Sequence, residues 1–289
     1  MQGGSPTVRR RRLASELRCL REGAGLTMEQ VSDRLGWSIT KISRIETCKV
    51  GVTPKDVGRL VGLYGLSPVK FDEIMELARD AQKKGWWQAY GDLPSEYATY
   101  IGLEAEAASI RCYAPEIIPG LIQTEDYARS VIRNSLVITP PGEIERRVDV
   151  RMTRQNLLSR PVPLHLWAIL DEAVLRRTVG GTAVMNHQLR HVLKLAESPH
   201  VTFQVLPFAA GAHAATSGAF TILEFPDHGD LDVVFLENLT GGLYVEREVD
   251  VYRYTLAFDH LRAKALDPED SYRLIAEIAQ GYDDLQGMD

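Results

Sequence analysis

The sequence predicts a multidomain protein in which an all-α domain of five short helices (residues 1–83) precedes an α+β domain with a mainly antiparallel sheet (residues 103–289). Three observations support this prediction. Apolar residues recur at helical spacing between capping residues through the first 80 positions. Runs rich in β-branched and aromatic residues begin only after residue 160. The charge also reverses, because residues 1–90 hold 16 Lys and Arg against 10 Asp and Glu, whereas the remainder holds 17 against 29.

The first domain carries a start signal for each of its helices. Leucines at helical spacing define the first helix, at residues 7–23. A Ser or Thr that can cap a helix begins each of the next four, and proline follows this cap in the last two. The expected caps are Thr27, which can form a capping box with Gln30, then Ser38, Thr53 and Ser67, and the fifth helix is expected to run to Lys84.

Residues 84–102 are expected to connect the two domains. The segment is rich in glycine, proline and aromatic residues. A flexible linker would lack the aromatic side chains. We therefore expect this segment to pack one domain against the other rather than to bind a base.

The second domain mixes both element types. Its strands are expected to be antiparallel neighbours from residue 201 onward, because the connections between them are short. The expected helices are 103–113, 124–134, 142–158, 182–197, 248–265 and 267–280, and the expected strands are 162–170, 201–208, 219–225, 232–239 and 242–246.

Residues 26–46, "LTMEQVSDRLGWSITKISRIE", predict two short helices joined by a tight turn. Helices of this length are marginal alone in water. Val31, Leu35 and Ile42 fall on inward faces, and Gly36 permits the left-handed conformation of the turn. This spacing fits a helix-turn-helix. An ordinary two-helix corner would explain the spacing, but neither the outward basic residues nor the charge asymmetry.

The outward face of the second helix in this motif predicts a major-groove contact with double-stranded DNA. Arg44 can read a guanine, Thr40 can bond a base edge, and Ile39 or the Thr40 methyl can meet a thymine methyl. Phosphate contacts are expected from Ser38, Lys41, Ser43 and the basic run at residues 9–12. The full predicted DNA-binding set is Thr27, Ser38, Ile39, Thr40, Lys41, Ser43, Arg44 and Lys49.

The pattern "LRCLREGAGLTMEQVSDRLGWSITKISRIE" resembles the lambda-repressor and Cro class of DNA-binding domains, often called Xre-type. Further stretches, among them "YIGLEAEAASIRCYAPEIIPGLIQTEDYAR" and "FLENLTGGLYVE", resemble actinobacterial regulators that include the WhiJ type. The resemblance implies a five-helix lambda-repressor-like head. It also implies an antitoxin-like association with a small cognate protein.

Two positions depart from the family pattern. Met28 stands where the family usually has Gln, whose amide commonly touches the DNA backbone, so one DNA contact is expected to be lost. Cys48 stands where the family often has Gly. Because a cysteine tolerates the left-handed conformation less well than glycine, the second helix of the motif is expected to end differently from its counterpart in the family.

No motif indicates a cofactor, a metal or a catalytic site. "HQLRH" at residues 187–191 lacks the Glu of a zincin, and three cysteines far apart form no disulfide or zinc pattern. The stretch 206–220, "LPFAAGAHAATSGAF", is expected to be either a pocket or docking groove, or a flexible connection between strands. No apolar run approaches the roughly 20 residues that cross a bilayer, so we expect a cytoplasmic protein without a membrane partner.

These observations predict a homodimeric, sequence-specific DNA-binding transcriptional regulator whose recognition helix spans residues 38–47. The second domain would supply dimerisation and control by a partner or effector. The alternative is an antitoxin-like protein that mainly binds a small cognate partner and binds DNA for autoregulation. An enzyme carrying a helix-turn-helix is the third possibility, and the absence of catalytic motifs argues against it.

Overall fold

The computed structural model describes residues 6–82, 85–91, 93–135, 140, 142–226, 232–239 and 241–286. The chain forms two compact units, Met1–Glu106 and Ala107–Asp289. The boundary between them lies beyond the expected connector at 84–102, within which a 3-10 turn and the beginning of a helix are found.

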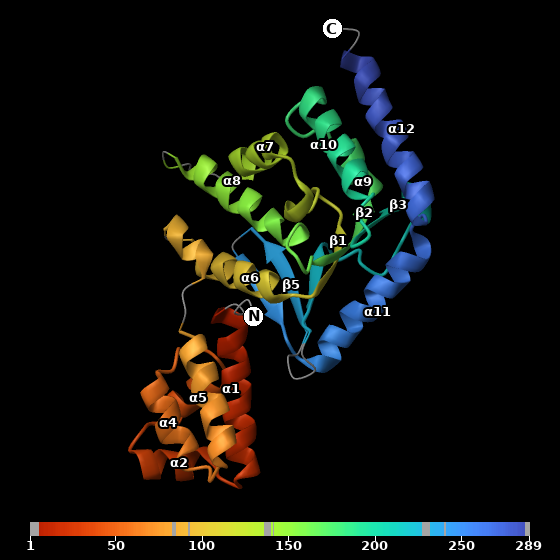
Figure 1. The fold of residues 1–289 in the computed structure, drawn as a ribbon. Coiled ribbons are helices and arrows are strands. Elements are labelled where there is room, and N and C mark those ends of the chain that lie inside the picture. The colour runs from red at the N-terminus through yellow and green to blue at the C-terminus, as the bar shows by residue number, and fades with distance from the viewer. Residues whose placement is uncertain are drawn as a thin grey trace. The chain divides into compact units, whose positions relative to one another are not determined.

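The first unit is the expected helical head with one further helix (Figure 1). The predicted caps are confirmed: the side chains of Thr27, Ser38, Thr53 and Ser67 each accept a backbone N–H three residues on. The fifth helix ends at Asp80, and Lys84 lies outside the described residues. The elements are α1 (Pro6–Gly23), α2 (Met28–Leu35), α3 (Ile39–Glu46), α4 (Pro54–Val61), α5 (Pro68–Asp80), η1 (Trp86–Tyr90) and α6 (Ser95–Glu106).

The expected helix at 103–113 is wrong. Helix α6 ends at Glu106, and strand β1 (Ser109–Ala114) follows after two residues. β1 pairs with strands on both of its sides, so tertiary pairing decides its conformation. The alanines before it favoured a helical interpretation of the sequence.

The second unit contains a six-stranded mixed sheet in the order β3-β2-β1-β4-β5-β6. β1, β2 and β3 are parallel, whereas β4, β5 and β6 continue the sheet as antiparallel neighbours. The expectation that the strand at 201 pairs with the next strand along the chain is wrong, because β3 lies at the far edge beside β2. The other strands are β2 (His165–Asp171), β3 (Val201–Leu206), β4 (Phe220–Glu224), β5 (Val233–Asn238) and β6 (Gly241–Val245).

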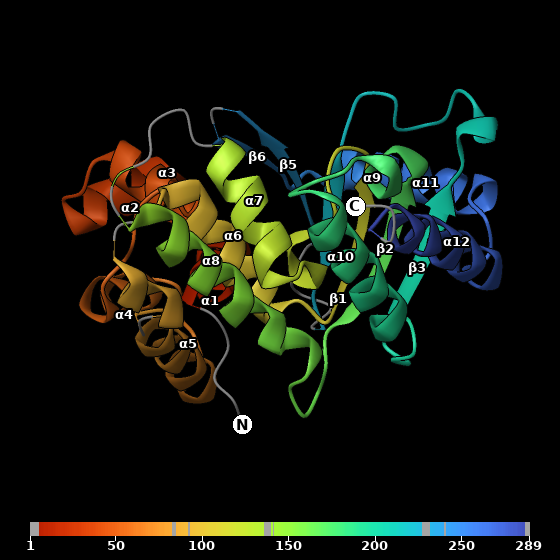
Figure 2. The same cartoon turned by 90° about the horizontal axis from the view of Figure 1, so that it is seen from above.

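Helices cover both faces of this sheet (Figure 2). α11 packs on one face, where Phe258 and Leu261 join a core with Ile169, Ile222 and Val234. α7, α8 and α10 lie on the opposite side, and α12 packs along α10 and the edge strand β3. The bounds are α7 (Glu125–Ser135), α8 (Glu143–Arg154), α9 (Glu172–Arg176), α10 (Thr182–Leu195), α11 (Glu248–Lys264) and α12 (Pro268–Gln286), with 3-10 turns η2 (Gly120–Ile122), η3 (Gln155–Leu158) and η4 (Phe208–Ala210).

Candidate nucleic-acid interface

The turn between α2 and α3 is built as a helix-turn-helix requires. Gly36 takes the left-handed conformation, with φ at +66°. The Ser32 hydroxyl donates to the Trp37 carbonyl and so fastens α2 to the start of α3. Val31 and Ile42 are fully buried beneath the turn. These contacts fix the orientation of α3, and they all lie on its buried side or in the turn. The exposed face of α3 therefore remains free of these contacts.

The outward face of α3 offers side chains of the kinds that bind DNA. Ile39 is 43% exposed, and Thr40, Arg44 and Lys49 are also exposed. Among the described residues, no side chain pairs with the guanidinium of Arg44 or the ammonium of Lys49. Both cations are therefore available to a base edge or a phosphate.

Lys41 lies differently from Arg44. Its Nζ forms an ion pair with Asp56 Oδ2 at 3.2 Å and sits 3.6 Å from the centre of the Trp37 ring. These contacts tie the first turn of α3 to α4. A phosphate contact by Lys41 would have to compete with the carboxylate for the same ammonium group.

The predicted hydroxyl contacts also serve as helix caps. The Thr27 oxygen accepts from Gln30 N at 3.2 Å, and the Ser38 oxygen accepts from Lys41 N at 3.1 Å. A hydroxyl that accepts a bond still carries a proton that it can donate to a phosphate. Both caps also place the positive end of a helix dipole at the outer surface. Ser43 is half-buried on the same helix.

The recognition helix ends in a left-handed residue, contrary to the expectation from Cys48. Cys48 has φ at +55°, and it is the one residue other than glycine with a positive φ among the described positions. Its N–H bonds the Ile45 carbonyl at 3.0 Å, and Lys49 N–H bonds the Arg44 carbonyl at 2.8 Å. This is a Schellman motif, which satisfies the last carbonyls of α3. The cysteine adopts the conformation that glycine would take more readily.

A buried ion pair anchors the end of α3, and the sequence interpretation did not include it. The carboxylate of Glu46, the last residue of α3, accepts hydrogen bonds from Arg21 Nε at 2.7 Å and from Arg21 Nη2 at 2.9 Å. A third bond runs from Arg21 Nη1 to the Leu26 carbonyl at 2.8 Å. The bond to Glu46 raises the pKa of Arg21 above its usual value, so the pair stays charged. One guanidinium thus joins α1, the loop before α2 and the recognition helix.

The basic run at residues 9–12 is partly used inside the head. Arg9 pairs with Asp80 at 3.4 Å, and Arg10 Nε donates to the Ala81 carbonyl at 3.0 Å. Both contacts lie at the C-terminal end of α5, where a cation is favoured. Met28 packs against the helical core, which agrees with an apolar role at that position. The predicted phosphate contacts of Arg9 and Arg10 would require these internal bonds to open.

Two family models match the chain. A helix-turn-helix domain model matches residues 12–74, the part of the head that contains α2 and α3. A model described as a domain of unknown function (DUF5753) matches residues 97–277, more than half of the sequence. The chain belongs to the DUF5753 family. No curated protein and no solved structure matches it. The helix-turn-helix match indicates a DNA-binding regulator, and the DUF5753 region holds the sheet domain.

Within the DUF5753 domain, the stretch 206–220 is anchored rather than loose. Tyr113 OH donates to Asp171 Oδ2 at 3.0 Å and lies 3.3 Å from His213 Nε2. Lys264 Nζ donates to the Ala212 carbonyl at 2.7 Å. These bonds hold the segment across the carboxyl ends of β1 and β2. Burial, followed by the charge of Asp171, raises the pKa of Tyr113 above its usual value, so the phenol remains a donor.

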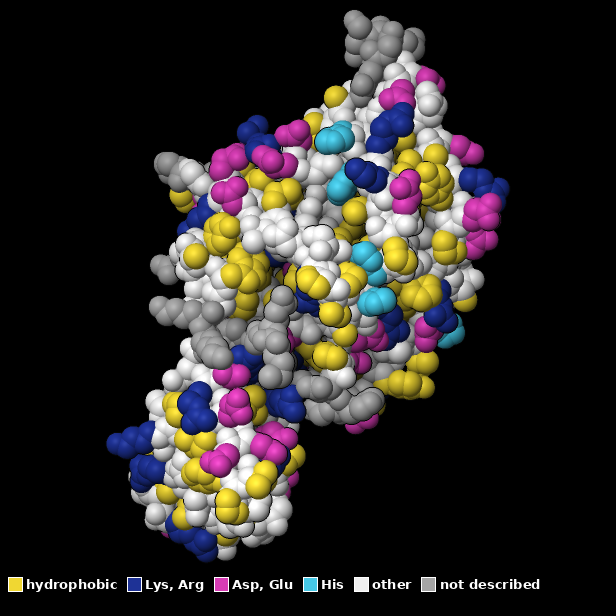
Figure 3. Space-filling model, viewed as in Figure 1, with side chains coloured by type: hydrophobic (Ala, Val, Ile, Leu, Met, Phe, Trp, Pro, Cys, Tyr) yellow, Lys and Arg dark blue, Asp and Glu magenta, His cyan; other side chains and the backbone are white. Residues whose placement is uncertain are grey.

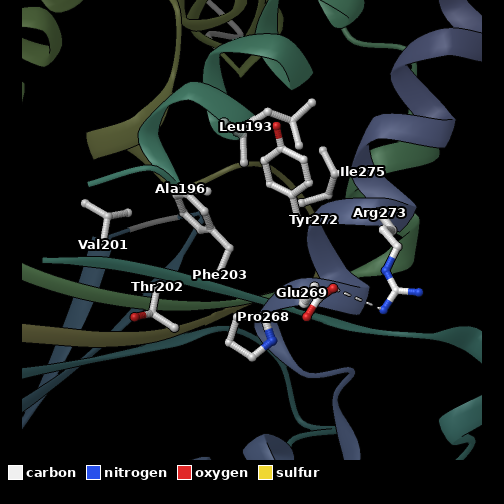
Figure 4. Close-up of a pocket in the computed structure, with 11 residues that line it drawn as sticks. Leu193, Ala196, Val201, Thr202, Phe203, Pro268, Glu269, Tyr272, Arg273 and Ile275 are labelled. Atoms are coloured by element: carbon white, nitrogen blue, oxygen red, sulfur yellow. Dashed lines mark ion pairs between the residues drawn. The ribbon is translucent and has the colours of Figure 1, made fainter. Parts of the chain in front are cut away.

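The DUF5753 domain has a cavity away from 206–220, between α10, β3 and α12 (Figure 4). Its volume is about 490 Å³, and its lining includes Leu193, Phe203 and Ile275. Arg273 points away from this apolar hollow and pairs with Glu269. The lining offers an apolar surface with few polar groups directed inward.

The part of the chain that the structure describes offers neither a membrane-spanning helix nor a cluster of metal ligands. No described helix combines the length and apolar character needed to span a bilayer. The described His, Cys, Asp and Glu residues include no group of three or more arranged to hold a metal ion.

Proposed function

We propose that this protein is an Xre-type, sequence-specific transcriptional regulator that places α3 in the major groove of DNA. One observation supports the proposal above all. The guanidinium of Arg44 lies on the outward face of α3, and no side chain among the described residues pairs with it. The opposite side of α3 is held in place by the buried Arg21–Glu46 pair. An exposed arginine can reach a base edge, and a buried anchor holds the helix that carries it in a fixed orientation.

Arg44 is expected to read one guanine. Arg44→Ala should weaken binding of the full-length protein to its selected site by about 1–3 kcal/mol, or roughly 5- to 150-fold, and relax preference at one base pair. Fluorescence anisotropy on the selected site and on random DNA at fixed salt measures both effects. Arg79→Ala, at an exposed arginine of α5 in the same unit, is the matched control. Equal weakening on specific and random DNA would argue against direct reading by Arg44.

The second domain would bring two heads together on DNA. One helix-turn-helix covers only a few base pairs, so we propose a homodimer on an inverted repeat, with the DUF5753 domain supplying dimerisation and control. The protein would act in the cytoplasm, without catalytic activity, a cofactor or a metal. Turnover by the isolated second domain would contradict the non-enzymatic part of this proposal.

A WhiJ-type, antitoxin-like role is the second candidate, and exposed apolar residues favour it. Phe208 is 59% exposed, and Leu239 and Leu243 near the edge strand β6 are 92% and 56% exposed. A small cognate protein could cover these positions within 206–220 and 236–246. Because such coupling is reciprocal, the partner should change DNA affinity by the same factor as DNA changes partner affinity, typically about 5- to 150-fold. A copurifying protein that leaves DNA affinity unchanged would argue against this role.

A further inference from the structure

Helix α11 carries a second apolar stripe on the side opposite its packed face. Val251 and Phe258 are buried against the sheet. At about 100° per residue, Val249, Tyr252 and Leu256 fall on the opposite side of the helix. Their exposed fractions are 57%, 60% and 40%. Figure 3 shows hydrophobic side chains on the surface over α11. A helix that is apolar on both sides is ordinarily covered on both sides.

The stripe is electrically neutral although the domain is acidic. Residues 107–289 hold 17 Lys and Arg against 25 Asp and Glu, whereas residues 247–262 hold three of each. Asp250 pairs with Arg253 at 3.3 Å and with Arg247, and Arg262 pairs with Asp259 at 3.6 Å. A charged partner would find no complementary field here. A second copy of this acidic chain could approach without repulsion between like charges.

We propose that α11 forms the dimer interface of this protein and that its occupant is α11 of a second copy. The proposal rests on the proposed function, because a head that covers one half-site needs a second head to bind an inverted repeat. The spacing of Val249, Tyr252 and Leu256 is the three-then-four spacing of a coiled-coil seam. The seam is also self-complementary.

In an antiparallel pair centred near Tyr252, Val249 of one copy lies opposite Leu256 of the other. Each apolar end of the stripe then covers the other, as a two-fold interface requires. The two tyrosines lie near the axis, where large aromatic anchors contribute most to affinity. Arg253 lies beside them and can contact the face of a tyrosine ring.

The test compares matched pairs of variants in full-length protein without DNA. Val249→Glu places a charge in the stripe, whereas Val162→Glu makes the same change at a valine that is 77% exposed elsewhere in the domain. Tyr252→Glu is matched by Tyr272→Glu on α12, where the tyrosine is 42% exposed. Glu in the first turn of α11 favours the helix, so Val249→Glu should fold.

Sedimentation equilibrium should show a wild-type dimer. The two α11 variants should raise its dissociation constant at least about 100-fold, because each charge enters the interface twice and each 1.4 kcal/mol is tenfold. The two control variants should remain dimeric. A monomeric wild type, or α11 variants that stay dimeric, would overturn the proposal.

A second measurement avoids substitutions. Amide exchange in residues 248–258 of the wild-type protein should slow as concentration rises through the dimerisation range. Exchange that is independent of concentration in a dimeric protein would also overturn the proposal. DNA binding by the α11 variants separates failure of the dimer proposal from failure of the proposed DNA-binding function. A monomer with an intact head should still bind a single half-site.

Discussion

Removing the carboxylate of Glu46 should destabilise the head while leaving the stability of the second unit unchanged. The Arg21 and Glu46 side chains are only 7% and 2% exposed, and two of the four hydrogen bonds of the Arg21 guanidinium end on this carboxylate. Glu46→Ala leaves the buried guanidinium without its buried counter-ion, and of the described carboxylates only the half-exposed Glu22 remains beside it. Loss of one partner from a buried pair costs about 3–5 kcal/mol. For a domain near 100 residues, this corresponds to a fall in Tm of about 12–40 °C.

Glu22→Ala is the matched control for this prediction. Glu22 contacts the same Arg21 at 3.3 Å, but its side chain is 51% exposed and also pairs with Arg18. Its removal leaves the bonds from Arg21 to Glu46 intact, so we expect no resolvable change in Tm. The comparison therefore separates burial from the mere presence of an ion pair.

Calorimetry of the full-length chain, with amide exchange to assign each transition to a unit, measures both variants. A third variant, Arg21→Met with Glu46→Leu, replaces the pair by apolar side chains of similar size. It should recover most of the lost stability, because buried pairs add little over well-packed apolar groups. A loss below about 1 kcal/mol for Glu46→Ala would refute the argument that the pair anchors the recognition helix.

Three further predictions follow from the geometry. Cys48→Gly should stabilise the head by about 0.5–1 kcal/mol, because glycine adopts a positive φ without the steric cost of a side chain; urea denaturation beside Cys48→Ala, which should gain nothing, checks this. Burial, followed by the charges of His187 and Lys194, lowers the pKa of His191. The unfolded chain therefore binds more protons in acid than the folded chain, so the free energy of unfolding should fall as the pH drops below about 6.5. Thermal melts from pH 5 to 8 should show a weaker pH dependence of stability for His191→Gln. Footprinting should show two protected half-sites whose centres lie about 10 base pairs, or a multiple, apart; a single asymmetric half-site would contradict the dimer.

The head was predictable because its information is local. Each cap lies three residues from the N–H that it satisfies, and the motif spacing fixes the inward positions. Even the missed ion pair left a signal. Arg21 continues the four-residue spacing of Leu13 and Leu17, and Glu46 follows Ile42 by four, so both charges stand on buried stripes. Two opposite charges at inward positions indicate a pair, but only the fold shows that they meet.

The sheet was predictable in its segments but not in its order. The strand segments near 165, 201, 220, 233 and 241 follow from composition. The place of β3 does not, because helices α9 and α10 separate it from its partner β2 and the pairing is parallel. β1 was missed for a related reason. Its six residues lie beside helix-forming alanines, and both of its partners come at least 50 residues later in the chain.

The central place of β1 has a consequence for synthesis on the ribosome. Ile110 of β1 pairs with Leu166 on one side and with Leu223 on the other, so the middle of the sheet stays open until nearly four-fifths of the chain has emerged. The head depends on contacts closer in sequence and can fold long before then. Nascent chains halted between residues 171 and 220 would therefore expose the free edge of β1, a template for pairing with other chains. Chains halted near residue 106 would leave a folded head without that hazard.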